Sequence, residues 1–192
     1  MKCYLDITLL PSADIDRHFL WEKVYQQIHL GLVEIQDGNG KIPLGIALPD
    51  YSAEKHQLGN KLRLLAETEA QLERFNAKQW LSRLSDYVHL TGIRNVPDRI
   101  KTHACYYRIQ PKSSNARLAR RKAKRENISV EQALSALEKF PEQRSNAPYV
   151  WIKSLSNGEK FRLFLGYVEV SEPVNAGFNA YGLSRQSSVP IF

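Results

Sequence analysis

Apolar and polar side chains alternate along the start of the chain. Between residues 2 and 10 every second position is apolar, and Pro11 ends the run. This period of two is typical of a strand with one buried face. Further apolar runs at 42–48, 62–65 and 87–93 predict three more strands, although the periodicity of the 62–65 run also allows a helix.

Two segments between these runs repeat their apolar residues at helical spacing. The first follows candidate caps at Ser12, Asp14 and Asp16. It is expected to run to about Leu30, because helices often end at a glycine such as Gly31. The second is expected to begin after Thr68. Its apolar face is formed by Leu72, Phe75, Trp80, Leu81 and Leu84.

The order of these elements, strand-helix-strand-strand-helix-strand, is that of the ferredoxin-like fold. In that fold two helices cover one face of a four-stranded antiparallel sheet. We therefore expect a ferredoxin-like domain over residues 1–96, whose first helix carries His29.

Strands and helices also mix in the second half of the chain, residues 97–192. Ser129 and Gln132 have the spacing of a capping box at the start of a helix. We predict the α+β class, with a distorted ferredoxin-like second half. Its expected elements are a strand at 103–110, a basic helix at about 116–126, a helix at 130–140 and a hairpin with strands at 149–155 and 160–170.

The amino-acid composition indicates which kind of partner the protein binds and in which compartment it is expected. The 192 residues include 27 Lys and Arg against 20 Asp and Glu, a net charge of +7 with a pI near 9.4. Such a balance favours nucleic acid or an anionic membrane surface. No apolar run approaches the roughly 20 residues of a membrane-spanning helix. The N-terminal run contains Asp6 and lacks a signal-peptide cleavage site, so it does not resemble a signal peptide. The two cysteines, Cys3 and Cys105, are not spaced as a disulfide or metal motif would be. A cytoplasmic protein with buried reduced thiols is therefore expected.

The segment 116–125 has six cations and no acid. On a helix, Arg117, Arg121, Lys124 and Arg125 share one side and Arg120 flanks them, while Ala116, Ala119 and Ala123 form a stripe opposite. A solvated surface face would usually interleave acids. The pattern therefore favours binding to a nucleic acid, with the solvated face as the alternative, and it does not distinguish DNA from RNA.

Neither a metal nor a cofactor is expected. The five histidines, 18, 29, 56, 89 and 103, form no metal-ligand pattern with one another or with acids, and the chain has no phosphate-binding glycine loop. His29 is expected at the carboxyl end of its helix, where the helix dipole would favour the protonated imidazole.

Several motifs together resemble one enzyme family. They are YLDITLLP with His29, YRIQPKS before the basic helix, WIKSLSNGEKFRLFL, and the ending GFNAYGLS…VPIF. In type and order they are similar to the CRISPR repeat-RNA endoribonucleases of type I-F systems, and the similarity covers the whole chain.

The resemblance implies a metal-independent ribonuclease that cuts precursor CRISPR RNA at the 3′ base of a repeat stem-loop. Its nucleophile would be the RNA 2′-hydroxyl, and its products a 2′,3′-cyclic phosphate and a 5′-hydroxyl. The enzyme would then stay bound to the mature RNA, together with other protein subunits of the type I-F complex. The second half, residues 97–192, would be the RNA-binding domain.

The resemblance also implies residue roles. His29, Ser154 and Tyr181 would be catalytic, and the residues themselves do not decide whether His29 acts as base or acid. The RNA-binding set would be Arg108, Gln110 and Phe161 at the stem base, with Arg117, Arg120, Arg121, Lys124 and Arg125 on the basic helix. Lys124 departs from the arginine expected there, and a lysine cannot grip a phosphate bidentately.

Two other interpretations stay open at this point. In one, the chain is a catalytically inactive module that binds an RNA stem-loop. In the other, it is a basic DNA-binding protein. Cleavage of a cognate stem-loop tests the first, and competition by duplex DNA tests the second.

Overall fold

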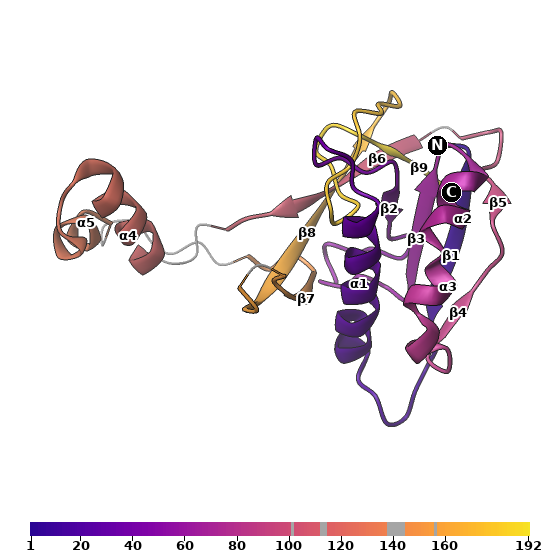
Figure 1. The fold of residues 1–192 in the computed structure, drawn as a ribbon, viewed down its shortest axis with the longest axis horizontal. Coiled ribbons are helices and arrows are strands. Elements are labelled where there is room, and N and C mark those ends of the chain that lie inside the picture. Colours follow the sequence, from indigo (N-terminus) through magenta and orange to yellow (C-terminus); the bar gives the residue numbers. More distant parts are fainter. Residues whose placement is uncertain (101, 112–114, 138–144, 156) are drawn as a thin grey trace. The chain divides into compact units, whose positions relative to one another are not determined.

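The computed structural model describes residues 1–100, 102–111, 115–137, 145–155 and 157–192 (Figure 1), and the side chain of Arg117 lies outside the described part. Contacts between residues divide the chain into two compact units. The larger unit comprises Met1–Arg108 and Ala147–Phe192, and the smaller one comprises Ile109–Asn146. Each unit is described by itself below.

The first sheet of the larger unit confirms the ferredoxin-like order of strands. Its strands run in the order β2-β3-β1-β4, every pair along this path is antiparallel, and β5 pairs with the far end of β1. The apolar residues of β1 lie in the core, as their period of two predicts. The strands are β1 (Cys3–Leu9), β2 (Gly45–Ala47), β3 (Lys61–Ala66), β4 (Val88–Leu90) and β5 (Arg94–Asn95).

Helices cover one face of this sheet. α1 (Arg17–Glu34) begins at Asp16, whose side chain accepts hydrogen bonds from the backbone N–H groups of His18 and Phe19. α2 (Glu69–Phe75) packs on β1 and β3, and the short α3 (Ala77–Trp80) packs on α1 (Figure 1). The prediction of one continuous helix after Thr68 is wrong: Asn76 takes a left-handed conformation, φ 49°, which ends α2. A 3-10 turn, η1 (Ser82–Leu84), follows α3.

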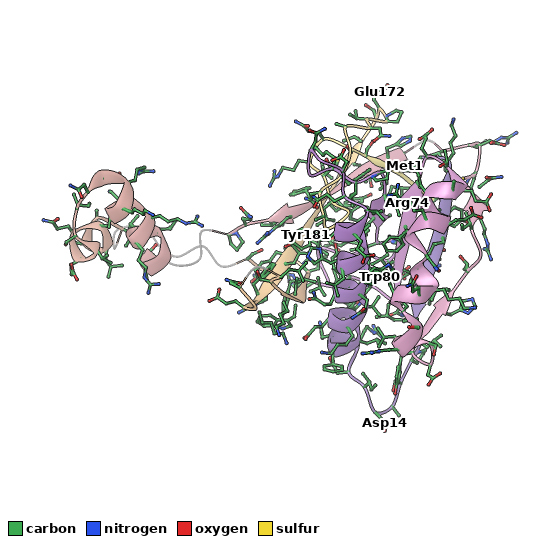
Figure 2. All side chains as sticks on the ribbon, viewed as in Figure 1. Met1, Asp14, Arg74, Trp80, Glu172 and Tyr181 are labelled. Atoms are coloured by element: carbon green, nitrogen blue, oxygen red, sulfur yellow. The ribbon has the colours of Figure 1, made fainter. Side chains whose placement is uncertain are left out.

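The prediction that the first helix ends near Gly31 is also wrong. α1 continues to Glu34, and Gly31 lies inside it. A Cβ atom at Gly31 would come within 2.6 Å of the Trp80 indole and 2.8 Å of the Phe75 ring (Trp80 is labelled in Figure 2). The glycine therefore allows the close approach of α1 to α2 and α3, and His29 lies before the last turn of α1.

A second sheet completes the larger unit. Its order, β7-β8-β6-β9, is again the ferredoxin-like order when these strands are numbered along the chain. A regular ferredoxin-like fold has a helix between its third and fourth strands, which are β8 and β9 here. Residues 171–188 form no helix, so the second half departs from the regular fold at this point. The strands are β6 (Thr102–Ile109), β7 (Tyr149–Lys153), β8 (Lys160–Val170) and β9 (Val189–Ile191).

The two sheets share one hydrophobic core. Leu5 and Leu64 of the first sheet and Ile152 and Leu163 of the second belong to the same buried cluster, together with the apolar side of α1. The expected boundary after residue 96 thus separates the two sheets but does not separate two compact units.

The smaller unit is a pair of helices. α4 (Asn115–Glu126) contains the basic segment, and α5 (Val130–Leu137) begins with the predicted capping box, in which Ser129 and Gln132 each accept a hydrogen bond from the other's backbone N–H, both 3.1 Å long. Ala119 and Ala123 are buried against Ala133 of α5. Residues 138–140, where this helix was expected to continue, lie outside the described residues.

Candidate active site and basic helix face

His29 is buried in the larger unit, with 5% of its surface exposed. Its ring is stacked on the ring of Tyr181, with the two centroids 4.3 Å apart and the planes 13° from parallel. Tyr181 (labelled in Figure 2) lies in the loop between β8 and β9, more than 150 residues away along the chain. The structure thus brings together two of the three predicted catalytic residues.

One hydrogen bond determines the tautomer of His29. Nδ1 lies 2.7 Å from the carbonyl oxygen of Ala180. A carbonyl oxygen only accepts, so Nδ1 carries the proton and the neutral ring keeps its lone pair on Nε2. The histidine is therefore prepared to accept a proton at Nε2.

Burial lowers the pKa of His29 below its ordinary value, and the hydrogen bond to Ala180 raises it in part. This direction is opposite to the one expected from the helix dipole. The dipole acts mainly within the last turn, which α1 forms beyond His29. The neutral imidazole therefore dominates at neutral pH.

A tight turn and α1 hold Tyr181 in place. The Asn179 side chain accepts a hydrogen bond of 2.9 Å from the backbone N–H of Tyr181, and Gly182 follows with a positive φ of 71°. The buried Tyr25, one helical turn before His29, donates its hydroxyl to the carbonyl oxygen of Tyr181 at 2.9 Å. α1 thus contacts this loop both at His29 and at Tyr25.

Arg108 and Phe161 lie beside the same tyrosine. The guanidinium of Arg108, on β6, is 5.0 Å from the centroid of the Phe161 ring on β8 and 5.8 Å from that of Tyr181. Four of the predicted residues therefore form one continuous group of contacts, which runs from His29 through Tyr181 to Arg108 and Phe161.

Ser154 follows the last residue of β7, and α1 holds that strand. Gln26 accepts a hydrogen bond of 2.8 Å from the backbone N–H of Lys153 and donates one of 3.4 Å to its carbonyl oxygen. Gln26 lies about one turn before His29, so the helix that carries the histidine also binds the segment that carries the serine. The sequence interpretation missed Gln26. Its position three residues before His29 was the signal available.

The basic helix face is the exposed side of α4. Arg120, Arg121, Lys124 and Arg125 are exposed there, while the alanine stripe is buried under α5 at Ala119 and Ala123 but not at Ala116. Glu126 is an acid at the end of α4: it accepts a hydrogen bond of 2.7 Å from Arg125 and lies 3.9 Å from Lys122. Arg117 belongs to α4, but its side chain is outside the described part.

Gln110 is exposed just beyond β6 and belongs to the smaller unit. The predicted RNA-binding residues are therefore distributed over both units, with Arg108 and Phe161 in the larger one.

Both cysteines are free and buried, as expected from their spacing. Among the described residues, there is no group of three or more histidine, cysteine or acidic side chains that could hold a metal ion. No helix of the described part has the length and apolar character needed to cross a membrane.

Comparison with known proteins shows which protein family this sequence matches. Residues 4–192 match the family model described as CRISPR-associated protein (Cas_Csy4). Over the full length of both chains, the protein is 32% identical to the CRISPR-associated endonuclease Cas6/Csy4 of Escherichia coli (strain UTI89 / UPEC) and 31% identical to the protein of the same name from Pseudomonas aeruginosa (strain UCBPP-PA14).

Proposed function

The chain belongs to the Cas_Csy4 family of CRISPR-associated proteins, and on this premise we propose that it cuts precursor CRISPR RNA at the 3′ base of a repeat stem-loop. The observation that carries the proposal is the buried His29 stacked on the half-buried Tyr181, next to Arg108 and Phe161. The two similar proteins are named endonucleases, which supports this activity over a module that only binds RNA.

The chemistry is transesterification at the scissile phosphate. Nε2 of His29 takes the proton of the 2′-hydroxyl, the 2′-oxygen forms a bond to phosphorus, and the bond from phosphorus to the 5′-oxygen breaks. The 5′-oxygen leaves and takes a proton from solvent, and His29 later gives the 2′-proton back to solvent, so the products are a 2′,3′-cyclic phosphate and a 5′-hydroxyl. The Nδ1 hydrogen bond to Ala180 supports the role of His29 as base, because it leaves Nε2 as the acceptor.

The other residues bind and orient the RNA. Ser154 holds the sugar of the attacking nucleotide, and Tyr181 fixes the plane of the imidazole. Arg108 and Gln110 read bases at the bottom of the stem, and Phe161 stacks beneath the terminal base pair. The cations of the basic helix face neutralise phosphates of the stem. The product stays bound and joins other protein subunits of a type I-F complex.

A cleavage assay with end analysis tests this function. The protein should cut a cognate repeat stem-loop at one site, with cyclic phosphate and 5′-hydroxyl ends, at an unchanged rate in excess chelator. The 2′-hydroxyl is already the nucleophile, so no metal-activated water is needed. A rate loss of more than about tenfold in chelator, or about 1.4 kcal/mol of barrier, would count against the mechanism.

The pH dependence tests the protonation state of His29. A general base must be neutral, so the single-turnover rate should rise with pH through the lowered pKa of His29 and level off above it. The measurement is the cleavage rate across acidic and neutral buffers with enzyme in excess. A rate that falls as pH rises over this range would assign His29 the role of acid instead.

A further inference from the structure

The hairpin of β7 and β8 has one face in the core and a second face that, apart from the buried Phe164, is half-exposed or exposed. Val150 and Ile152 of β7 lie in the hydrophobic core, opposite Leu163 and Phe161 of β8. The alternating residues point the other way. We call this second set the hairpin outer face. It consists of Tyr149, Trp151 and Lys153 on β7, paired with Phe164, Arg162 and Lys160 on β8.

Aromatic rings hold a cation at the centre of this face. The guanidinium of Arg162 is 5.4 Å from the ring centroids of both Tyr149 and Trp151, and 5.9 Å from that of Phe164. Among the described residues, no carboxylate lies within ion-pair distance of Arg162. Tyr149 and Trp151 remain half-exposed. The face thus offers aromatic surface around a cation that pairs with no acid in the described part of the chain.

The end of this face nearest to Ser154 is formed by two lysines. Lys153 and Lys160 are paired across the hairpin between Trp151 and the turn that contains Ser154. Lys160 also lies 5.1 Å from the centroid of Trp151 and 2.6 Å from Glu22, the acid that partly compensates it. From Ser154 outward, the hairpin therefore presents two lysines, then Arg162 with its rings.

We propose that the hairpin outer face binds the single-stranded RNA that lies 3′ of the cut. The inference rests on the proposed function, because that strand begins at the scissile phosphate and so emerges at the Ser154 end of the hairpin. Single-stranded RNA is bound by aromatic rings on which bases stack and by cations that contact phosphates. A protein partner fits less well, since interface centres are depleted of lysine and this face is half cationic.

The test compares two RNAs that cannot be cut, because each has a deoxynucleotide just upstream of the cut. One ends shortly after the stem, and the other continues into a single-stranded 3′ flank. The flank should strengthen binding to the unmodified protein by about fivefold or more, the smallest gain expected from one stacked base. Trp151→Leu and Arg162→Gln should remove most of this gain and leave the affinity for the short RNA unchanged.

Two control variants identify the cause of any loss. Trp151→Phe keeps a ring and should keep most of the gain. Arg74→Gln removes an exposed charge from α2 and should leave the gain intact (Arg74 is labelled in Figure 2). Circular dichroism and thermal melting check that each variant is folded.

Two outcomes would overturn the inference. Either the flank adds nothing to the affinity of the unmodified protein, or it adds a gain that Trp151→Leu and Arg162→Gln leave untouched. In the second case the flank binds elsewhere and the hairpin outer face serves another partner, such as a protein. Failure of the proposed function is a separate result, because the unmodified protein would then leave uncut the same stem-loop made with a ribonucleotide just upstream of the cut.

Discussion

Replacing His29 with alanine should lower the single-turnover rate of RNA cleavage by about 10²–10⁴-fold, the usual contribution of a positioned proton-transfer group. The affinity for the stem-loop should stay within a few-fold, because Arg108, Phe161 and the basic helix face remain. The measurements are the cleavage rate with enzyme in excess and the dissociation constant for an RNA that cannot be cut. His29 is buried against Tyr181, so thermal melting must show that the variant is folded.

His89→Ala is the matched control, since His89 is exposed on β4. Its cleavage rate should equal that of the unmodified protein. The unmodified protein should also bind, and fail to cut, an RNA that lacks only the 2′-hydroxyl upstream of the cut. This substrate removes the nucleophile and leaves the base in place. Normal cleavage of the deoxy RNA would mean that a water attacks, and the transesterification mechanism would be wrong.

A different result would concern only the assignment of the histidine. If His29→Ala cut normally and the deoxy RNA did not react, the chemistry would stand and another group would be the base. His103 on β6 would then be the next residue to replace, since the His89 control has already been measured.

Replacing Arg121, Lys124 and Arg125 together with alanine should weaken stem-loop binding and reduce its dependence on salt. Each lost phosphate contact lowers the slope of log affinity against log salt by roughly 0.7–0.9. If all three side chains contact phosphates, the slope should therefore fall by about two to three. The measurement is the dissociation constant over a series of salt concentrations.

The fold of the smaller unit should survive this change. α4 packs on α5 through Ala119 and Ala123, whereas the three replaced side chains are exposed. Alanine is also a better helix former than arginine or lysine. The matched control replaces Lys2, Arg74 and Arg83, which are exposed on the larger unit and carry the same total charge. An unchanged slope in the α4 variant, or an equal change in the control, would assign the basic helix face to solvent.

Local patterns in the sequence were enough to predict most of the elements and the family. The alternation of β1, the cap at Asp16 and the capping box at Ser129 depend on residues close together in the chain. The motif resemblance depended on residue types in order, and the family comparison confirms it. The same local patterns led to two errors, at Gly31 and Asn76. Gly31 lies inside a helix because other helices pack closely against it, and Asn76 interrupts a helix because its backbone is left-handed. Neither cause can be read from the neighbouring residues in the sequence.

The chemistry of His29 was decided by tertiary structure. From the sequence, its place on a helix suggested an imidazole favoured in the protonated form. In the folded chain, burial keeps the ring neutral, and the Ala180 carbonyl holds the proton of the neutral ring on Nδ1. Ala180 and Tyr181 are about 150 residues away from His29 along the chain. No periodicity or spacing encodes such a contact, because burial and hydrogen bonding are set by whichever distant segments the shared core brings together.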